Sequence, residues 1–309
     1  MLHKNAIVGM STRSRSHQAR LVIPIEVLES RVLFSVFWVS NANDNGAGSL
    51  RQAITQADAL KGTQTIDFAV GKGAQTIEPR SALPALTTPI ILDAQTQPGY
   101  TGTPLIQLDG ALAGSVNGLV ITAGGSTIKG LAVNHFSENG ILGVNVGDNT
   151  VAGDYIGTDL TGSIKEPNGQ DGILLYGGSN VVGGMKSGSR NVISGNGKTG
   201  LQFLGPATGK NLVQGNYMGT DVTGKKAVPN YEGVGIFNSS TGNLIGGLSA
   251  GAGNVISGNI ADGVDIGSND TAVEGDILGL TADGATKLAN VGQNVLQIGS
   301  SGNTIVHNV

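Results

Sequence analysis

The sequence has no cysteine, few aromatic residues and few charged residues. Aromatic side chains make up 4% of its 309 residues, and Asp, Glu, Lys and Arg together make up 13%. The absence of cysteine excludes disulfides, zinc ribbons and thiol catalysis together. The shortage of bulky side chains makes a conventional globular core difficult to fill. These absences predict a narrow interior that Val, Ile, Leu and Ala can fill.

Long hydrophobic runs and basic clusters are also missing. No apolar run approaches the ~18 residues that a membrane-spanning helix needs, and Glu26, Glu29 and Arg31 interrupt the apolar segment that starts at Leu21. Lys and Arg number 18 against 22 Asp and Glu, so a basic stripe that follows phosphates is not expected. No GxxxxGK[ST] phosphate loop occurs. We therefore predict no nucleic-acid partner and no spanning segment.

What the sequence does contain is an internal repeat. The phrases NTVAGDYIGTDLTG from Asn149, NLVQGNYMGTDVTG from Asn211 and TAVEGDILGLTADG from Thr271 are near-copies, 62 and 60 residues apart. A second phrase, NVISGN, starts at Asn191 and again at Asn254, 63 residues later. Self-similarity at a fixed period predicts a solenoid.

The repeat divides into short apolar triplets separated by Gly, Asn, Asp and Ser. These β-branched triplets are too short for helices and predict strands of three to five residues. A unit of about 62 residues would then hold three turns of roughly 21 residues, each with three strands and three corners. The predicted fold is an all-β parallel β-helix. The triplets begin at Asn149, Asn180, Asn191, Asn211, Asn243, Asn254 and Asn303.

The asparagines at these corners are predicted to be structural. Asn tolerates the left-handed conformation that a sharp corner requires, and stacked amides can form hydrogen-bonded ladders along a pile of strands. We expect this role rather than ligand binding for Asn180, Asn191, Asn211, Asn243 and Asn254.

The N-terminal part is organised differently. Residues 1–35 contain several basic residues before the first acid and predict a disordered leader or sorting segment. Residues 36–63 predict a strand and a short helix over about 50–60, with Ser49 as N-cap and Gln52 completing a capping box. This helix is expected to cover the open first coil. Residues 64–309 would form the β-helix, without a C-terminal cap.

Two segments resemble known bacterial surface proteins. LESRVLFS, Leu28–Ser35, resembles the Leu-Glu-x-Arg-x-Leu-x-Ser motif near the start of surface or extracellular proteins of planctomycete-type bacteria. NDNGAGSLRQAI is similar to the SLREA-type region that precedes β-helix repeats in such proteins, and IGTDLTG and NVISGN resemble the repeats themselves. The resemblance implies a right-handed, pectate-lyase-like β-helix that is exported to the cell surface or beyond. It implies no common activity.

Candidate catalytic residues are few. Polysaccharide lyases and hydrolases need paired carboxylates or a base beside them, and Asp154 with Asp159 forms such a pair in the first copy, while Asp221 alone remains in the second. A pair kept in one of three copies is a poor candidate, and His135 is interpreted as a polar loop residue. We therefore favour a structural or binding module, directed towards polysaccharide, over the alternative of a polysaccharide lyase or glycoside hydrolase.

The candidate metal-binding aspartates and the candidate sugar-binding tyrosines each have two interpretations. Asp159 and Asp221 are predicted to cap turns; the alternative is calcium held by them together with Asp171 and Glu232. No cofactor is therefore predicted, with calcium as the alternative. The residues Tyr155, Tyr176 and Tyr217 could offer a surface to sugars, although half-buried corner packing is the favoured interpretation.

The end of the sequence opens one more triplet. NTIVHNV, from Asn303, starts another strand without a capping helix after it. Because solenoids normally carry polar caps, we expect either that the last coil pairs with another subunit or that the chain is a shortened member of a longer repeat family. The predicted partners are polysaccharide or cell-surface components, and a second copy of the chain.

Overall fold

The structure is a computed structural model that describes residues 35–206, 209–238 and 240–309. The chain divides into two units, Met1–Leu33 and Phe34–Val309, and the following concerns the second. The predicted leader and all but the last residue of the LESRVLFS segment lie outside the described residues. None of the described helices is long and apolar enough to cross a membrane.

Ten parallel strands form the longest sheet, sheet A. Each strand pairs with the strand that follows it one coil later, so neighbours in space are distant in sequence. Its strands, in order, are β1 Val36–Val39, β2 Gln64–Phe68, β4 Ile90–Asp93, β7 Thr127–Lys129, β10 Thr150–Ala152, β13 Val181–Gly183, β16 Leu212–Gln214, β19 Leu244–Gly246, β22 Ala272–Glu274 and β25 Thr304–Val306.

Two further parallel sheets complete the walls. Sheet B contains β3 Gln75–Ile77, β5 Ile106–Asp109, β8 Leu131–Asn134, β11 Tyr155–Ile156, β14 Val192–Ile193, β17 Tyr217–Met218, β20 Val255–Ile256 and β23 Ile277–Leu278. Sheet C contains β6 Leu119–Ile121, β9 Ile141–Gly143, β12 Ile173–Leu175, β15 Thr199–Leu204, β18 Glu232–Phe237, β21 Val264–Ile266 and β24 Val295–Gln297.

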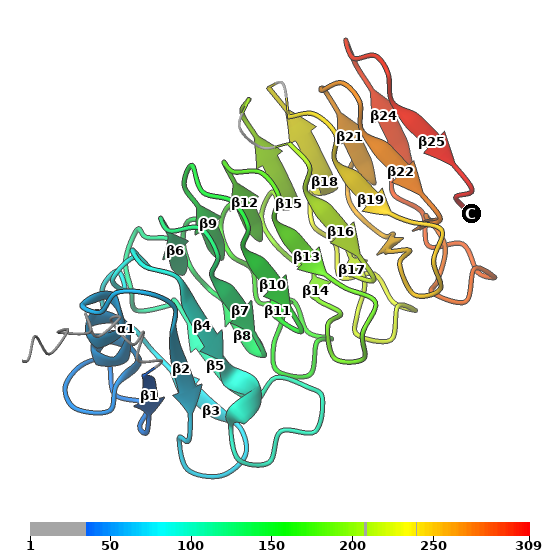
Figure 1. The fold of residues 1–309 in the computed structure, drawn as a ribbon. Coiled ribbons are helices and arrows are strands. Elements are labelled where there is room, and N and C mark those ends of the chain that lie inside the picture. The colour runs from blue at the N-terminus through cyan, green and yellow to red at the C-terminus, as the bar shows by residue number, and fades with distance from the viewer. Residues whose placement is uncertain (1–34, 207–208, 239) are drawn as a thin grey trace, which may run out of the picture. The chain divides into compact units, whose positions relative to one another are not determined.

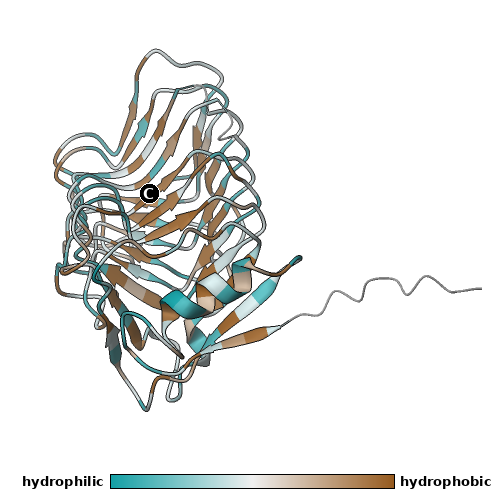
Figure 2. Ribbon diagram, turned by 90° about the vertical axis from the view of Figure 1, so that its left-hand side faces the viewer, coloured by the Kyte–Doolittle hydropathy of each residue, from teal (hydrophilic) through white to brown (hydrophobic). Residues whose placement is uncertain are grey.

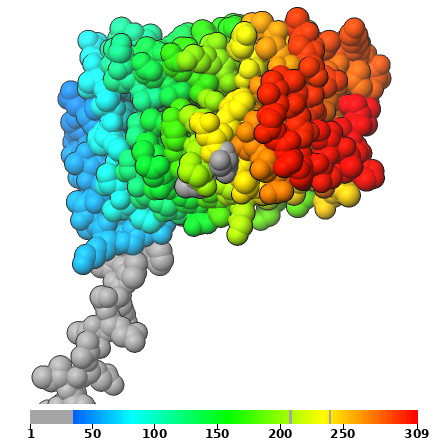
Figure 3. Space-filling view, turned by 90° about the horizontal axis from the view of Figure 1, so that it is seen from above, coloured from blue at the N-terminus to red at the C-terminus, as the bar shows by residue number. Residues whose placement is uncertain are grey.

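From β4 onward the chain passes through sheets A, B and C in turn and then returns to sheet A. The strands therefore stack in sequence order, as the colour progression in Figures 1 and 3 shows. This arrangement is a right-handed parallel β-helix, which confirms the predicted fold class. Val192 and Val255 lie in one register of sheet B, because both pair with Tyr217.

The predicted coil length is wrong. The backbone N–H of Asn149 bonds to the side chain of Asn180, 31 residues on, and Asn180 bonds to Asn211 after another 31. One repeat therefore holds two coils rather than three. The error arose because each coil contains a long loop and a sheet C strand in addition to the triplets that begin with Asn.

The long loops explain why the sequence repeats every second coil. One coil of each pair turns tightly from sheet A to sheet B and then forms a hairpin, closed by bridges at Thr158–Lys165, Thr220–Ala227 and Leu280–Lys287. The other coil has its long loop between sheets A and B instead, at residues 184–191 and 247–254, and turns tightly into sheet C. The two loop positions alternate along the stack.

A thin apolar core runs through the coils. Between the two end strands β1 and β25, one inward column of sheet A contains only aliphatic residues at 0–1% exposure, and the strands carry most of the hydrophobic residues in Figure 2. Each rung covers its neighbour, as expected for a solenoid. The column consists of Ile66, Leu92, Ile128, Val151, Val182, Val213, Ile245 and Val273.

Hydrogen-bonded asparagine ladders occupy the corners, as predicted. Before sheet A, Asn180 Nδ2 donates to Asn211 Oδ1 at 3.0 Å, and Asn211 donates to Asn243 at 3.0 Å. Between sheets A and B, Asn191 donates to Asn216 at 2.9 Å and Asn216 donates to Asn254 at 3.0 Å. These hydrogen bonds are the ones that the structural interpretation of the asparagines predicts.

A third ladder, between sheets B and C, was not predicted. Each amide donates to the next at 2.9–3.2 Å, and each is buried. Three members follow the hairpins at spacings of 62 and 60 residues, so the repeat already carried the signal. The members are Asn168, Asn196, Asn230, Asn259 and Asn290.

A helix covers the first coil. Helix α1, Leu50–Asp58, buries Leu50, Ala53, Ile54 and Ala57, which lie on one face of the helix, against the core. Ser49 Oγ accepts from Gln52 N at 3.2 Å, while Gln52 Oε1 accepts from Gly48 N at 2.9 Å. The capping box is therefore present, but its return bond reaches one residue further back than predicted. A 3₁₀ turn, η1 Ala94–Thr96, follows β4.

Candidate functional site

The outer face of sheet B carries one continuous column of side chains. Strand pairing places its members one rung apart, about 5 Å between neighbours. The column changes from polar to aromatic and aliphatic along the stack. In order, it contains Thr76, Gln107, Ala132, Tyr155, Val192, Tyr217, Val255 and Ile277.

Hairpins cover the middle of this column. Ala132, Tyr155 and Val192 form a small buried cluster, against which Leu160 and Val222 pack from two successive hairpins. The hairpins also bond to each other across two coils, since Val222 N donates to Gly162 O at 2.8 Å. Tyr155 is 5% exposed, so its ring is packed rather than free, as the favoured interpretation of the tyrosines predicts.

A cavity opens beside this cluster. Its volume is about 200 Å³, and its walls include Tyr155, Arg190, Val192 and Val222 together with the side-chain-free Gly153. We call it the Tyr155–Arg190 pocket. Burial raises the pKa of the Tyr155 phenol, and the nearby Arg190 charge opposes that rise.

Arg190 is held in a fixed orientation. Its guanidinium carbon lies 4.1 Å from the centre of the Tyr217 ring, a cation–π contact. Its Nε donates to Gly215 O at 3.0 Å. Tyr155 and Tyr217 therefore belong to one surface, while Tyr176 follows β12 on sheet C and is not part of it.

Five polar side chains gather at the other end of the column. Gln107 Nε2 lies 3.1 Å from Glu166 Oε2, and Asn134 Nδ2 donates to the same oxygen at 2.8 Å. His135 Nδ1 lies 3.2 Å from Asp109 Oδ1, an ion-pair contact when the imidazole is protonated, although the groups are not aligned for a hydrogen bond. We call these residues the Gln107 cluster.

The Gln107 cluster contains three titratable side chains, those of Asp109, His135 and Glu166. Burial raises the pKa of Glu166, His135 lowers it, and the neighbouring acids raise it again. His135 adopts a left-handed backbone conformation, φ 58°, which few residues other than Gly, Asn and Asp take routinely. Gln107 lies two rungs from Tyr155, about 10 Å, so the pocket and the cluster share one wall.

Of the predicted catalytic residues, Asp159 lies close enough to Glu166 to raise its pKa, whereas Asp154 lies inside the coil. Asp154 is 0% exposed and occupies a corner ladder, where its Oδ1 accepts from Leu131 N at 2.8 Å. It cannot reach a saccharide, so its assignment as a catalytic candidate is wrong. The reason is that Asp154 replaces an asparagine of the ladder, which the short phrase did not reveal.

Asp159 and Asp221 cap their own hairpins. Asp159 accepts from Thr161 Oγ1 at 2.8 Å and from Ile164 N at 3.0 Å, and Asp221 accepts in the same way from Thr223 and Lys226 N. Burial raises the pKa of Asp159, but these hydrogen bonds outweigh it and hold the pKa below its usual value. The hydrogen bonds are those of the predicted turn caps.

Acidic side chains also meet on sheet C. Carboxylate oxygens of Glu232, Asp262 and Asp265 lie within 4.8 Å of one another. Burial and then mutual repulsion raise the pKa of both Glu232 and Asp265. Thr199 connects Glu232 to Asp171, through bonds of 3.3 Å from its hydroxyl and 3.0 Å from its N–H. The acids near Glu232 are therefore Asp262 and Asp265, and not the Asp159 and Asp221 of the calcium alternative.

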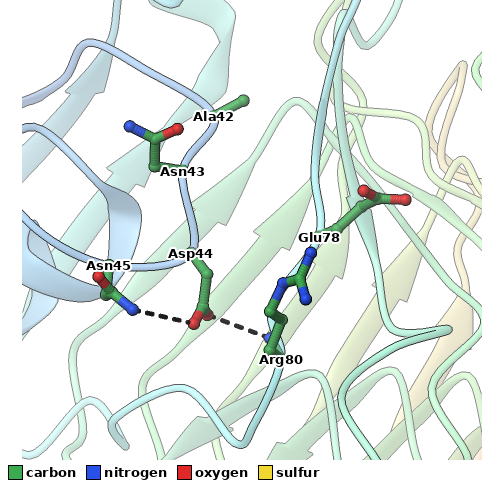
Figure 4. Close-up of a pocket in the computed structure, with 6 residues that line it drawn as sticks. All are labelled: Ala42, Asn43, Asp44, Asn45, Glu78 and Arg80. Atoms are coloured by element: carbon green, nitrogen blue, oxygen red, sulfur yellow. Dashed lines mark hydrogen bonds between the residues drawn. The ribbon is translucent and has the colours of Figure 1, made fainter.

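A larger hollow at the N-terminal end has a structural explanation. It measures about 450 Å³ and is lined by Asp44, Glu78 and Arg80 among others (Figure 4). Asp44 pairs with Arg51 at 2.7 Å and accepts from Arg80 N at 3.1 Å. Through these contacts, Asp44 of the NDNGAGSLRQAI segment connects the loop before α1 to the helix and to the chain after β3.

Solved structures share this fold. The A-module of mannuronan C-5 epimerase AlgE4 from Azotobacter vinelandii aligns with a TM-score of 0.52 and 15% identity, over 88% of this chain and 76% of its own. Pectate lyase Pel9A aligns with a TM-score of 0.37 and 15% identity, over 89% and 78%. At 15% identity, the likeness to the epimerase module shows the β-helix fold alone. The sequence matches no family model and no curated protein.

Most residues of this wall were not predicted from the sequence. Asp109, His135 and Glu166 are separated by about thirty residues each and belong to no repeated phrase. Only the coil length brings them together, and that length was mispredicted. The signal that could have found Arg190 was its place directly before a repeated NVISGN phrase.

Proposed function

We propose that this chain is an extracellular or cell-surface module that binds polysaccharide along the outer wall of sheet B. The observation that carries the proposal is one wall on which the Tyr155–Arg190 pocket and the Gln107 cluster lie about 10 Å apart. A stack of coils presents an extended surface, and a linear polymer that reaches both sites would pass over the hairpins that cover Ala132 and Tyr155.

The side chains on this wall suit a sugar. A sugar ring has an apolar face, which an aromatic or aliphatic pocket can contact, and hydroxyl groups that both donate and accept hydrogen bonds. Gln107 and Asn134 each offer an amide donor and a carbonyl acceptor, and Asp109 and Glu166 offer carboxylate acceptors. The extracellular location is supported by the resemblance of LESRVLFS and of the repeats to exported proteins.

Replacing Gln107 with Ala is expected to weaken retention on a bound polysaccharide about 5- to 10-fold, because its amide bonds would be lost and Glu166 would lose a partner. The measurement is affinity electrophoresis on a panel of acidic and neutral glycans, with and without calcium. Gln202→Ala is the matched control, since Gln202 faces outward on strand β15 of sheet C. Equal weakening by both variants, or no glycan retained by the wild type, would contradict the proposal.

A second candidate function is cleavage of the bound glycan by a lyase or hydrolase activity. It is favoured by His135, whose Nδ1 lies 3.2 Å from Asp109 Oδ1, beside Glu166, whose pKa is raised. Such a pair of groups can act in general acid–base catalysis.

If cleavage occurs, His135→Asn is expected to lower its rate at least about 100-fold, because Asn accepts the left-handed backbone but supplies no base. The measurement is release of reducing ends or of unsaturated products from the glycans retained above. Circular dichroism is the check on folding. Full activity in the folded variant would rule out His135 as the base.

A further inference from the structure

We propose that the Tyr155–Arg190 pocket receives an anionic substituent of a sugar, a uronate carboxylate or a sulfate ester; this inference rests on the proposed function. It names the class of polysaccharide that the wall selects, and it follows from the charge, the repeat and the shape of the pocket.

The positive charge of Arg190 has no acidic partner among residues 35–206, 209–238 and 240–309. Within the described residues the ion pairs are Arg51–Asp44, Lys129–Asp93 and the contact of His135 with Asp109. Arg190 uses its Nε for Gly215 O, and its two terminal nitrogens make no hydrogen bond to the described protein. A planar guanidinium with both terminal groups free is suited to a two-point contact with a carboxylate or sulfate.

The repeat supplies an internal comparison. Gly253 takes the place of Arg190 one repeat later, 63 residues on, directly before the same NVISGN phrase. Asn191 and Asn254 join the same ladder, so the coil forms equally well without the arginine.

The loop that carries Arg190 differs from its counterpart in charge. Residues 184–190 read GMKSGSR and contain Lys186 and Arg190, whereas residues 247–253 read GLSAGAG and contain no charge. The fold does not require these basic residues, since the second loop lacks them. Their presence in one loop therefore points to a role in binding.

The shape of the pocket fits one sugar residue. Its volume of about 200 Å³ is below the ~300–1,000 Å³ of sites that enclose drug-sized ligands. Val222 and the edge of Tyr155 supply an apolar wall backed by the buried Val192, and a Cβ added at Gly188 would meet no neighbouring atom. Tyr217 beneath the guanidinium fixes the direction of the charge.

The experiment compares charged and neutral forms of the same polymers. Polygalacturonate is paired with its carboxyl-reduced form, and dextran sulfate with dextran, and binding is measured by titration calorimetry. We expect the wild type to bind at least one charged form about 10-fold or more tightly than its neutral form. Which pair shows the difference distinguishes carboxylate from sulfate.

Arg190→Gly introduces the residue that the repeat already uses, so the fold is expected to persist. This variant should lose the preference for the charged form while binding the neutral form unchanged. Arg80→Gln, which removes a positive charge from the N-terminal hollow, is the matched control and should keep the preference. Thermal unfolding of both variants checks that they fold.

Two results would overturn the inference, and they are distinguishable. If the wild type binds charged and neutral forms equally, or if Arg190→Gly keeps the preference, the anion subsite is wrong while the proposed function stands. If the wild type binds none of the polymers tested here or in the wider panel, the proposed function fails and the subsite fails with it.

Discussion

Replacing Asp154 with Asn is expected to stabilise the protein above about pH 8. The variant should also lack much of the decline in stability that the wild type shows between about pH 4 and pH 8. Burial raises the pKa of the Asp154 carboxyl to about 8, against the opposing effect of hydrogen bonds from Leu131 and neighbouring backbone groups. The folded protein thus holds this carboxyl protonated at neutral pH.

The ladder explains why a proton is needed. Asn191 and Asn216 each donate from Nδ2 to a strand carbonyl of the preceding coil, Val151 O and Val182 O. Asp154 Oδ2 is buried without a hydrogen-bond partner. A proton on this oxygen would restore the donor that the other members have, and asparagine would supply it at every pH.

The sign of the effect follows from the direction of the shift. A group whose pKa is raised on folding contributes its full stability below its unfolded pKa of about 4, and this stability is lost as the pH rises through the folded value. A shift from 3.8 to about 8 corresponds to a loss of up to about 6 kcal/mol, complete above that pH. Asp276, with a pKa raised to about 7 chiefly by burial, adds to the same trend.

The measurement is urea unfolding at pH 4, 6 and 8.5. Asp154→Asn should match or exceed the wild type at high pH, and its stability should vary less with pH. Asp270→Asn, which removes an exposed aspartate at a left-handed position, is the control and should leave the pH dependence unchanged. A parallel pH dependence in the wild type and in Asp154→Asn would show that the carboxyl is not held protonated.

Replacing Asn216 with Ala is expected to lower the free energy of unfolding by about 3–5 kcal/mol. The Asn216 amide, 0% exposed, accepts from Asn191 N and Nδ2 and donates to Val182 O and Asn254 Oδ1. Truncation leaves several of these buried groups without partners, and each costs about 1–3 kcal/mol.

Denaturant unfolding at neutral pH checks this value. Asn43→Ala, which truncates an exposed amide, is expected to change stability by less than about 0.5 kcal/mol. Asn216→Asp should acquire the pH dependence described for Asp154, since the two residues occupy the same ladder. A loss below about 1 kcal/mol in Asn216→Ala would mean that the ladder bonds contribute little beyond coil stacking.

The fold could be predicted because the triplets that form its strands recur at a regular spacing in the sequence. Repeated triplets at one spacing require repeated strands, and α1 has an apolar face and a cap that are visible in its own residues. The coil length could not be predicted in the same way. Loops such as 158–165 and 184–191 alternate between two corners, and their lengths carry no periodic signal, so counting triplets divided the repeat wrongly.

The corner residues show a finer limit. Asn191 and Asn254 were recognised because the residue type repeats, whereas Asp154 was assigned to catalysis because aspartate in a short phrase has several uses. Only the burial of its side chain distinguishes a ladder aspartate from a catalytic one. That burial depends on the register of the coils. The wall of sheet B depends on that register too, since Gln107, Tyr155 and Tyr217 share a column only when each coil has its observed length.

The contacts between hairpins set the smallest building block of this architecture. Val222 bonds to Gly162, and Ala282 bonds to Gly224, so each hairpin rests on one that is two coils away and skips the coil between them. Excising or duplicating a single coil would bring a hairpin against the wrong corner, while excising or duplicating a pair would preserve every partner. Gene segments of this kind can therefore lengthen or shorten the molecule in steps of two coils.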